Sequence, residues 1–222
     1  MDIQNIIYHQ TNTWPDKEEI KKASNEDVFH FIHKVFLKGM LGEIKRVMAN
    51  SHDGKEKCGG VGHIVLISIC CAIDSISSYF LPEILKKDKN SDHEKRKYFF
   101  EHSPFVDEKD WRLGDSKARY INFIKRFFDK KYEPKCENIY GCFRCASVHG
   151  WNLHRSSISG ESEDKNHLTI FENGVIHISL YDFFNDFESA VTKYANQLKN
   201  DADLLANFIK RYENERKNLG AE

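Results

Sequence analysis

The apolar stretch Val61–Leu81, VGHIVLISICCAIDSISSYFL, constrains the fold of this chain more than any other segment. Its apolar residues occur all the way round a helix, so several neighbouring elements are needed to cover it. His63, Asp74 and several serines interrupt it, and its purely apolar part is shorter than a membrane span. We therefore expect a buried central helix from Val61 to about Leu85, and no membrane partner.

Two segments that flank this stretch have helical periodicity. Ser24–Asp27, SNED, has the sequence of a capping box, and the apolar residues after it recur at helical spacing to about Ala49. A second amphipathic helix is expected to begin at Asp115 or Ser116 and to end before Pro134. Both are expected to belong to one helical bundle.

The C-terminal part of the chain changes its period once. A helix is expected over Glu137–Gly150, followed by a polar loop over residues 154–166. Asn173–Gly174 between two short apolar runs is a strong signal for a β-hairpin. The last helix is expected to run from Tyr181 to about Arg216, because the helical period returns there.

These elements predict an all-α fold, a helical bundle with one small β-hairpin before the C-terminal helix. Residues 1–23 are expected to form an N-terminal arm, and residues 24–222 are long enough for a single domain with its own core. The N-terminus lacks the apolar run of a secretory signal. Six cysteines without such a signal indicate free thiols in a reducing compartment, so we expect a cytoplasmic protein.

The net charge of −1 argues against a general nucleic-acid-binding protein, but the charge is unevenly distributed. Trp111–Lys135 carries eight Lys or Arg against three Asp or Glu, whereas the chain from Glu161 to its end carries seven against twelve. A basic strip suits a phosphate-containing ligand. A solvated, lysine-rich helix face explains the strip equally well.

The segment Tyr140–Arg155, YGCFRCASVHGWNLHR, is the most unusual in composition. Arg144 and His149 are the two kinds of group that metal-free RNA cleavage needs, a fixed cation for the phosphorus centre and a proton-transfer group. The spacing is weak evidence, because Arg46–His52 and Arg96–His102 have similar ones. Five residues along an ideal helix also turn the side chain by about 140°, which separates the pair within one chain.

Two other interpretations of this segment remain open. Cys142, Cys145 and His149 share one helical face, and Cys136 lies six residues before Cys142, so the four residues form a possible zinc set. No second cysteine pair closes a tetrahedron, and we expect no metal. In the third interpretation the segment is ordinary packing, with Arg144 paired to an acid and His149 at a polar helix end.

The segment IYGCFRCASVHGW, residues 139–151, resembles the HEPN superfamily (higher eukaryotes and prokaryotes nucleotide-binding), in particular small bacterial HEPN-like proteins with an Arg-x4-His motif. The matching residues are Phe143, Arg144, Cys145, Val148 and His149. The resemblance extends over roughly Ser24–Lys199, and its specific part is the motif.

The resemblance implies a homodimeric helical bundle in which the motif helices of two chains meet in a cleft. It also implies metal-independent endoribonuclease activity of a toxin or defence effector, without a cofactor, with Arg144 and His149 as catalytic residues. RNA or a nucleotide would be the ligand, and an antitoxin or defence-system protein a possible partner. For substrate binding the candidates are Ser147, Asn152, His154 and Arg155.

The chain departs from the family pattern at two positions. Cys145 stands where catalytic members commonly carry Asn, Asp or His, and Trp151 stands where toxins silenced by a nucleotidyltransferase carry tyrosine. Many members are not catalytic. The alternative hypothesis is therefore a non-catalytic HEPN-like dimer that binds a nucleotide, RNA or a protein partner.

Overall fold

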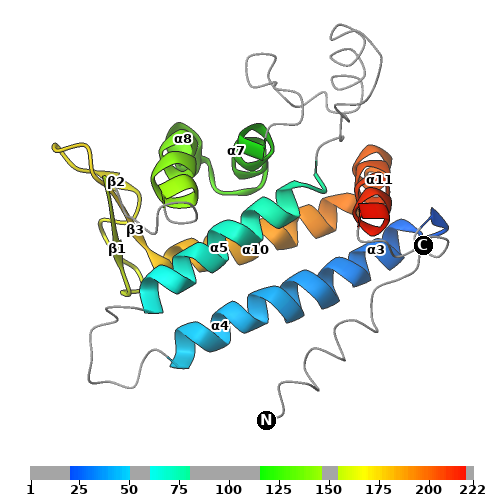
Figure 1. The fold of residues 1–222 in the computed structure, drawn as a ribbon, viewed down its shortest axis with the longest axis horizontal. Helices are drawn as coiled ribbons and strands as arrows, with labels where there is room; N and C mark the ends of the chain where they lie inside the picture. The colour runs from blue at the N-terminus through cyan, green and yellow to red at the C-terminus, as the bar shows by residue number, and fades with distance from the viewer. Residues whose placement is uncertain (1–20, 51–60, 81–115, 147–154, 219–222) are drawn as a thin grey trace, which may run out of the picture.

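This computed structural model describes four parts of the chain: 21–50, 61–80, 116–146 and 155–218. Within them the chain is mostly helical, with a small sheet at one end of the bundle, as the sequence predicts (Figure 1). Helices α5 (Val61–Ser77) and α10 (Leu180–Leu198) run side by side through the middle of the bundle and contact most of the other helices. Most of the expected N-terminal arm lies outside the described residues.

The N-terminal helical segment consists of α3 (Asn25–Ile32), the π-helical η1 (His33–Met40) and α4 (Leu41–Asn50). The expected capping box is confirmed. Ser24 Oγ accepts from the Asp27 N–H at 3.2 Å, and the Asp27 carboxylate accepts from the Ser24 N–H at 2.9 Å. These reciprocal bonds satisfy backbone donors that have no partner inside the helix, so they fix where the helix begins.

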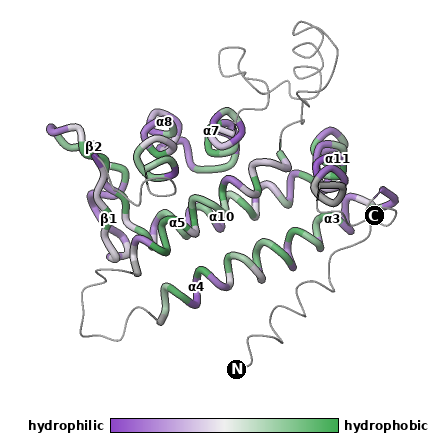
Figure 2. Tube along the Cα trace, viewed as in Figure 1, coloured by the Kyte–Doolittle hydropathy of each residue, from purple (hydrophilic) through white to green (hydrophobic). Residues whose placement is uncertain are grey.

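The central helix is shorter and less covered than its composition predicts. It ends at Ser77 rather than near Leu85, and a turn follows to Phe80. The hydroxyls of Ser77 and Ser78 donate to carbonyls three residues earlier, which competes with continued helical bonding. Ile73 is fully buried, but Ile64 is 47% exposed, so the expectation of cover on every face is wrong. Figure 2 shows the strongly apolar colouring along this helix.

The chain between the central helix and the sheet follows the expected order. Helix α7 (Ser116–Phe127) is followed by the 3-10 turn η3 (Lys130–Lys135), the short α8 (Cys136–Asn138) and the π-helical η4 (Ile139–Cys145). The motif helix is thus confirmed as far as the structure describes it, and its expected end at Gly150 lies outside the described residues.

The sheet has the strand order β1-β3-β2. Strands β2 (Thr169–Ile170) and β3 (Ile176–Ser179) are antiparallel, which confirms the hairpin, and Gly174 has a φ of +75° in its turn. Strand β1 (Ser156–Ser159) pairs parallel with β3, so the expected polar loop is wrong at this position. Strand β1 contains one apolar residue, so its sequence shows no alternation typical of a strand. It is a strand because it pairs with β3, twenty residues later in the chain.

The C-terminal helical region is two helices rather than one. Ser179 Oγ caps α10 by accepting from the Asp182 N–H, and α10 ends at Leu198. Asp201 then accepts from the Leu204 N–H and begins α11 (Ala202–Asn218). Among the described residues, no helix is both long and apolar enough to cross a bilayer.

Candidate functional site

Arg144 lies on η4, where the backbone winds as a π-helix. Such segments are uncommon and occur often at functional sites. In a helix with i→i+5 hydrogen bonds, residues five apart share a face, unlike in an α-helix. Tyr140 and Cys145 are five apart within this segment, and their side chains interact. Arg144 and His149 are also five apart in the sequence. The π-helical winding includes Arg144 and Cys145 and ends there, and His149 lies outside the described residues.

Arg144 forms an ion pair with Asp74 across two elements. Its Nη2 atom lies 2.6 Å from Asp74 Oδ2, and the two side chains are 15% and 27% exposed. The guanidinium also lies 5.5 Å from the centre of the Tyr140 ring, within cation–π range. The contact joins η4 to the central helix α5, so it both links the bundle and fixes the direction of the arginine.

The charge of Arg144 is secure in this setting. Burial lowers the pKa of the guanidinium. The hydrogen bond to Asp74 and the negative charge of Asp74 raise the pKa by more than burial lowers it, so the net shift is upward. Asp74 in turn sits in a mostly apolar helix, where an unpaired carboxylate would be costly. A lone acid in an apolar run is the sequence signal that predicts a buried cationic partner, although it does not identify Arg144.

Aromatic and thiol groups surround the ion pair. The Tyr140 hydroxyl lies 3.3 Å from Ser116 Oγ, and burial raises the pKa of this tyrosine. Burial also raises the pKa of the Cys71 thiol, and the neighbouring Asp74 carboxylate raises it again while Arg144 opposes the shift. Cys71 is therefore a protonated thiol near neutral pH rather than a reactive thiolate.

Of the six candidate residues, the structure describes Arg144 and Arg155. Ser147, His149, Asn152 and His154 lie outside the described residues. Arg155 is exposed, has a φ of +54°, and directly precedes β1. Burial raises the pKa of Cys142, and the positive charge of Arg155 opposes that shift, which places Arg155 within electrostatic range of η4. Arg144 therefore lies on the motif helix, and Arg155 influences it through its charge.

The possible zinc ligands are not gathered in the described parts of the chain. Cys136 is buried, and its Sγ donates to the Glu133 carbonyl at 3.1 Å. Cys142 and Cys145 are partly exposed on η4. No group of three or more His, Cys, Asp or Glu side chains that could hold a metal occurs among the described residues.

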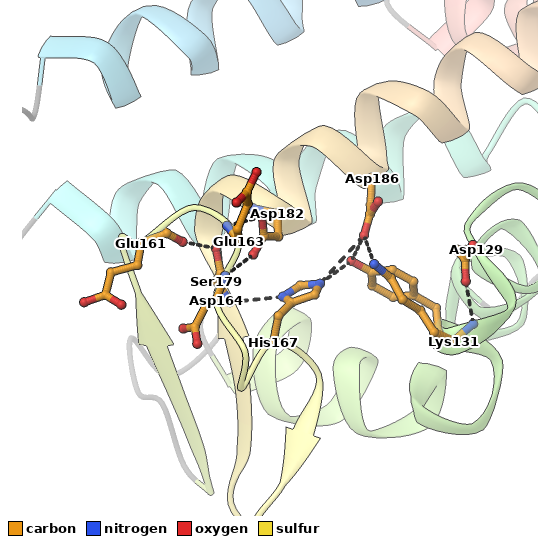
Figure 3. Close-up of polar contacts among 10 residues, drawn as sticks. Asp129, Lys131, Glu161, Glu163, Asp164, His167, Ser179, Asp182 and Asp186 are labelled. Atoms are coloured by element: carbon orange, nitrogen blue, oxygen red, sulfur yellow. Dashed lines mark hydrogen bonds and ion pairs between the residues drawn. The ribbon is translucent and has the colours of Figure 1, made fainter.

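A second polar cluster, which the sequence interpretation missed, lies between η3, the β1–β2 connection and α10 (Figure 3). The Tyr132 hydroxyl lies 2.8 Å from both His167 Nε2 and Asp186 Oδ2, and Lys131 Nζ is also 2.8 Å from Asp186. His167 Nδ1 accepts from the Ser179 N–H at 3.1 Å. The neutral ring therefore carries its proton on Nε2 and donates to Tyr132, which donates to Asp186.

This cluster lines a pocket of about 350 Å³. Burial opposes ionisation of Asp186, but hydrogen bonds from His167, Lys131 and Tyr132 outweigh it and lower its pKa to about 2. Asp182, on the same pocket wall, accepts from the backbone N–H groups of Glu163 and Asp164, at 3.0 Å each. Because these carboxylates are satisfied within the chain, the cluster fastens the β1–β2 connection to α10.

The chain was compared with known protein families, curated proteins and solved structures. None of them matches it.

Proposed function

We propose that this protein is a metal-independent ribonuclease of HEPN type in which Arg144 stabilises charge on the phosphorus centre and His149 transfers protons. The observation that carries the proposal is the 2.6 Å contact between Arg144 and Asp74. A cation held in place before the substrate arrives needs no reorganisation when negative charge develops.

The proposed reaction uses the 2′-hydroxyl of RNA as the nucleophile. His149 takes its proton as the oxygen bonds to phosphorus, and the bond to the 5′-oxygen of the next nucleotide breaks. The departing oxygen takes that proton from His149, and the products carry a 2′,3′-cyclic phosphate and a 5′-hydroxyl. Arg144 binds the non-bridging oxygens, which carry most of the developing charge.

The same ion pair also favours a second candidate function. Asp74 already neutralises Arg144, and only 15% of the arginine side chain is exposed. This arrangement suits an arginine that joins two helices in a non-catalytic dimer that binds RNA, a nucleotide or a protein. The two candidates differ in whether bound RNA is cut.

The test is cleavage of a fluorescent RNA in EDTA by the wild type, Arg144→Lys, Arg144→Ala and His149→Ala. The ribonuclease proposal requires cleavage by the wild type, cyclic-phosphate ends, and no cleavage of a substrate whose 2′-hydroxyl is replaced by hydrogen. The matched controls are Arg46→Ala and His52→Ala, since Arg46 is also ion-paired, to Glu43, and lies in a similar Arg–His spacing. RNA binding without cleavage by the wild type would favour the binding function.

Light scattering tests the proposed dimer separately. A homodimer in which the helix of Arg144 lies at the interface should give twice the monomer mass at tens of micromolar, a concentration at which weak specific interfaces form. A monomer under those conditions, in a preparation that cuts RNA, would remove the dimer cleft from the proposal.

A further inference from the structure

Three polar side chains line up on one face of the sheet, apart from the Arg144 segment. In the parallel register of β1 and β3, Ser157 is paired with His177. Register partners on adjacent strands point to the same face. Ser157 Oγ lies 2.7 Å from His177 Nδ1, and His177 Nε2 lies 2.8 Å from Asp164 Oδ2. The order is a hydroxyl, an imidazole and a carboxylate, linked by two short hydrogen bonds.

The carboxylate fixes the tautomer of the imidazole. Hydrogen bonds from Ser159, from His177 and from the Asn166 N–H lower the pKa of Asp164 to about 2, so it is ionised near neutral pH. An ionised carboxylate only accepts, and the neutral ring therefore keeps its proton on Nε2. Nδ1 is then left as an acceptor, and the Ser157 hydroxyl donates to it. Such a polarity is what a general base needs in order to take a proton from serine.

His177 and Asp164 are well shielded, whereas Ser157 remains partly open. The side chains of His177 and Asp164 are 12% and 8% exposed. Ser157 is half-buried on β1, which lies at the edge of the described sheet. Shielding keeps water from competing for the hydrogen bonds that orient the ring, and the partial exposure of Ser157 leaves its oxygen within reach of a small molecule.

We propose that Ser157 is a nucleophile activated by His177, with Asp164 as the residue that positions the ring, and that it reacts with the acyl carbon of small esters. The proposal does not rest on the ribonuclease function, because none of these residues belongs to the Arg144 segment.

Two neighbouring features suit an acyl group. The ring of Phe171, which is 39% exposed, lies 6.1 Å from the His177 ring and provides an apolar surface beside the imidazole. The Arg155 carbonyl accepts from the Ile176 N–H, so the backbone groups of Arg155 face β3. Because alternate residues of a strand face the same neighbour, the Ile158 N–H points away from β3. A backbone N–H one residue after the nucleophile is a donor that can stabilise the oxyanion.

The reaction is balanced without a cofactor. Ser157 Oγ bonds to the carbonyl carbon while its proton moves to His177 Nδ1. The bond to the leaving alcohol breaks, and that oxygen takes the proton from Nδ1. Water then attacks the acyl carbon and gives a proton to Nδ1. The bond from the acyl carbon to Ser157 Oγ breaks, Oγ takes the proton from Nδ1, and a carboxylic acid is released.

The experiment is labelling of the whole protein with a fluorophosphonate probe, followed by peptide mapping. The probe forms a bond from serine oxygen to phosphorus and loses fluoride, so it reports an activated serine without knowledge of the natural substrate. We expect one label per chain, at Ser157, and slow hydrolysis of p-nitrophenyl acetate that Ser157→Ala removes. His177→Ala should slow labelling by roughly a hundredfold or more, the usual contribution of a general base.

Ser159 is the matched control, because its hydroxyl donates directly to Asp164 rather than to an imidazole. It should not be labelled, since a carboxylate with so low a pKa is a weak base. Arg46→Ala should leave labelling unchanged. A wild-type protein that takes no label, or that takes it equally at Ser159, overturns the proposal, and neither result depends on whether a variant folds.

Discussion

The Arg144 segment and the polar face of the sheet both hold polar side chains in fixed positions, but they do so through different kinds of contact. At Arg144 an ion pair joins two helices whose paired residues are seventy positions apart. At the sheet, Ser157, Asp164 and His177 lie within twenty-one positions, where strand register pairs Ser157 with His177 and the β1–β2 connection supplies Asp164. Register fixes one pair of this chain of hydrogen bonds, and the carboxylate of the connection completes it. At Arg144 the ion pair is accompanied by the aromatic ring of Tyr140.

The largest effect should be on activity, and it should separate the two regions. Arg144→Ala and His149→Ala should each lower RNA cleavage by roughly a hundred- to ten-thousand-fold through lost charge stabilisation or proton transfer, without affecting fluorophosphonate labelling. His177→Ala should lower labelling and leave RNA cleavage intact. The measurements are initial cleavage rates and labelling rates on the same preparations. Loss of both activities in one variant would mean that the regions are not independent.

Removal of Asp74 should cause the largest loss of stability. Asp74→Ala leaves the mostly buried Arg144 without its carboxylate, and we expect a decrease of about 2–3 kcal/mol in the free energy of unfolding, below the cost for a fully buried pair. Urea unfolding measures it. Glu43→Ala, which breaks the exposed pair with Arg46, is the control and should cost under about 1 kcal/mol. Equal losses for both variants would contradict a special role of the Asp74 contact.

Loss of the Tyr132 hydroxyl should cause the next largest decrease in stability. Tyr132→Phe removes the hydroxyl that joins His167 to Asp186, and unfolding should become about 1–3 kcal/mol easier because two partners lose a hydrogen bond. Tyr194→Phe is matched in burial, but its hydroxyl has a single contact, with the Tyr79 carbonyl at 3.2 Å. Thermal melting should show the smaller shift for Tyr194→Phe. The reverse order would mean that the Tyr132 network contributes little.

Acid should lower the stability of the fold by protonating Asp164 and Asp186. The pKa values of Asp164 and Asp186 are lowered to about 2 in the folded chain. Each ionised carboxylate therefore stabilises the fold at pH values above about 4, the ordinary pKa of an aspartate. That stability disappears as pH falls from about 4 to about 2, and it amounts to at most about 2 kcal/mol for each residue. Unfolding measured from pH 6 to pH 2 should show a shallower decline in Asp186→Asn. An unchanged decline would mean that other groups govern acid unfolding.

Periodicity and local hydrogen bonding explain what could be predicted of the fold. The capping box at Ser24 and the turn at Gly174 act within a few residues, so their effect is visible in the sequence. The break at Asp201 is also local, because its carboxylate begins a new helix, yet the periodicity of the flanking segments concealed it. The exposed side of α5 was not predictable, since composition does not say which neighbours cover a helix.

The sequence by itself determined the helical segments and the hairpin, and it marked the Arg144 segment by its unusual composition. Only the tertiary structure decided that Asp74 is the partner of Arg144, that Ser156–Ser159 is a strand, and that His167 and His177 each have a fixed tautomer. The physical reason is distance along the chain. Helix caps and turns form between near neighbours, whereas ion pairs, parallel strands and buried imidazoles take their partners from segments that meet only when the bundle packs.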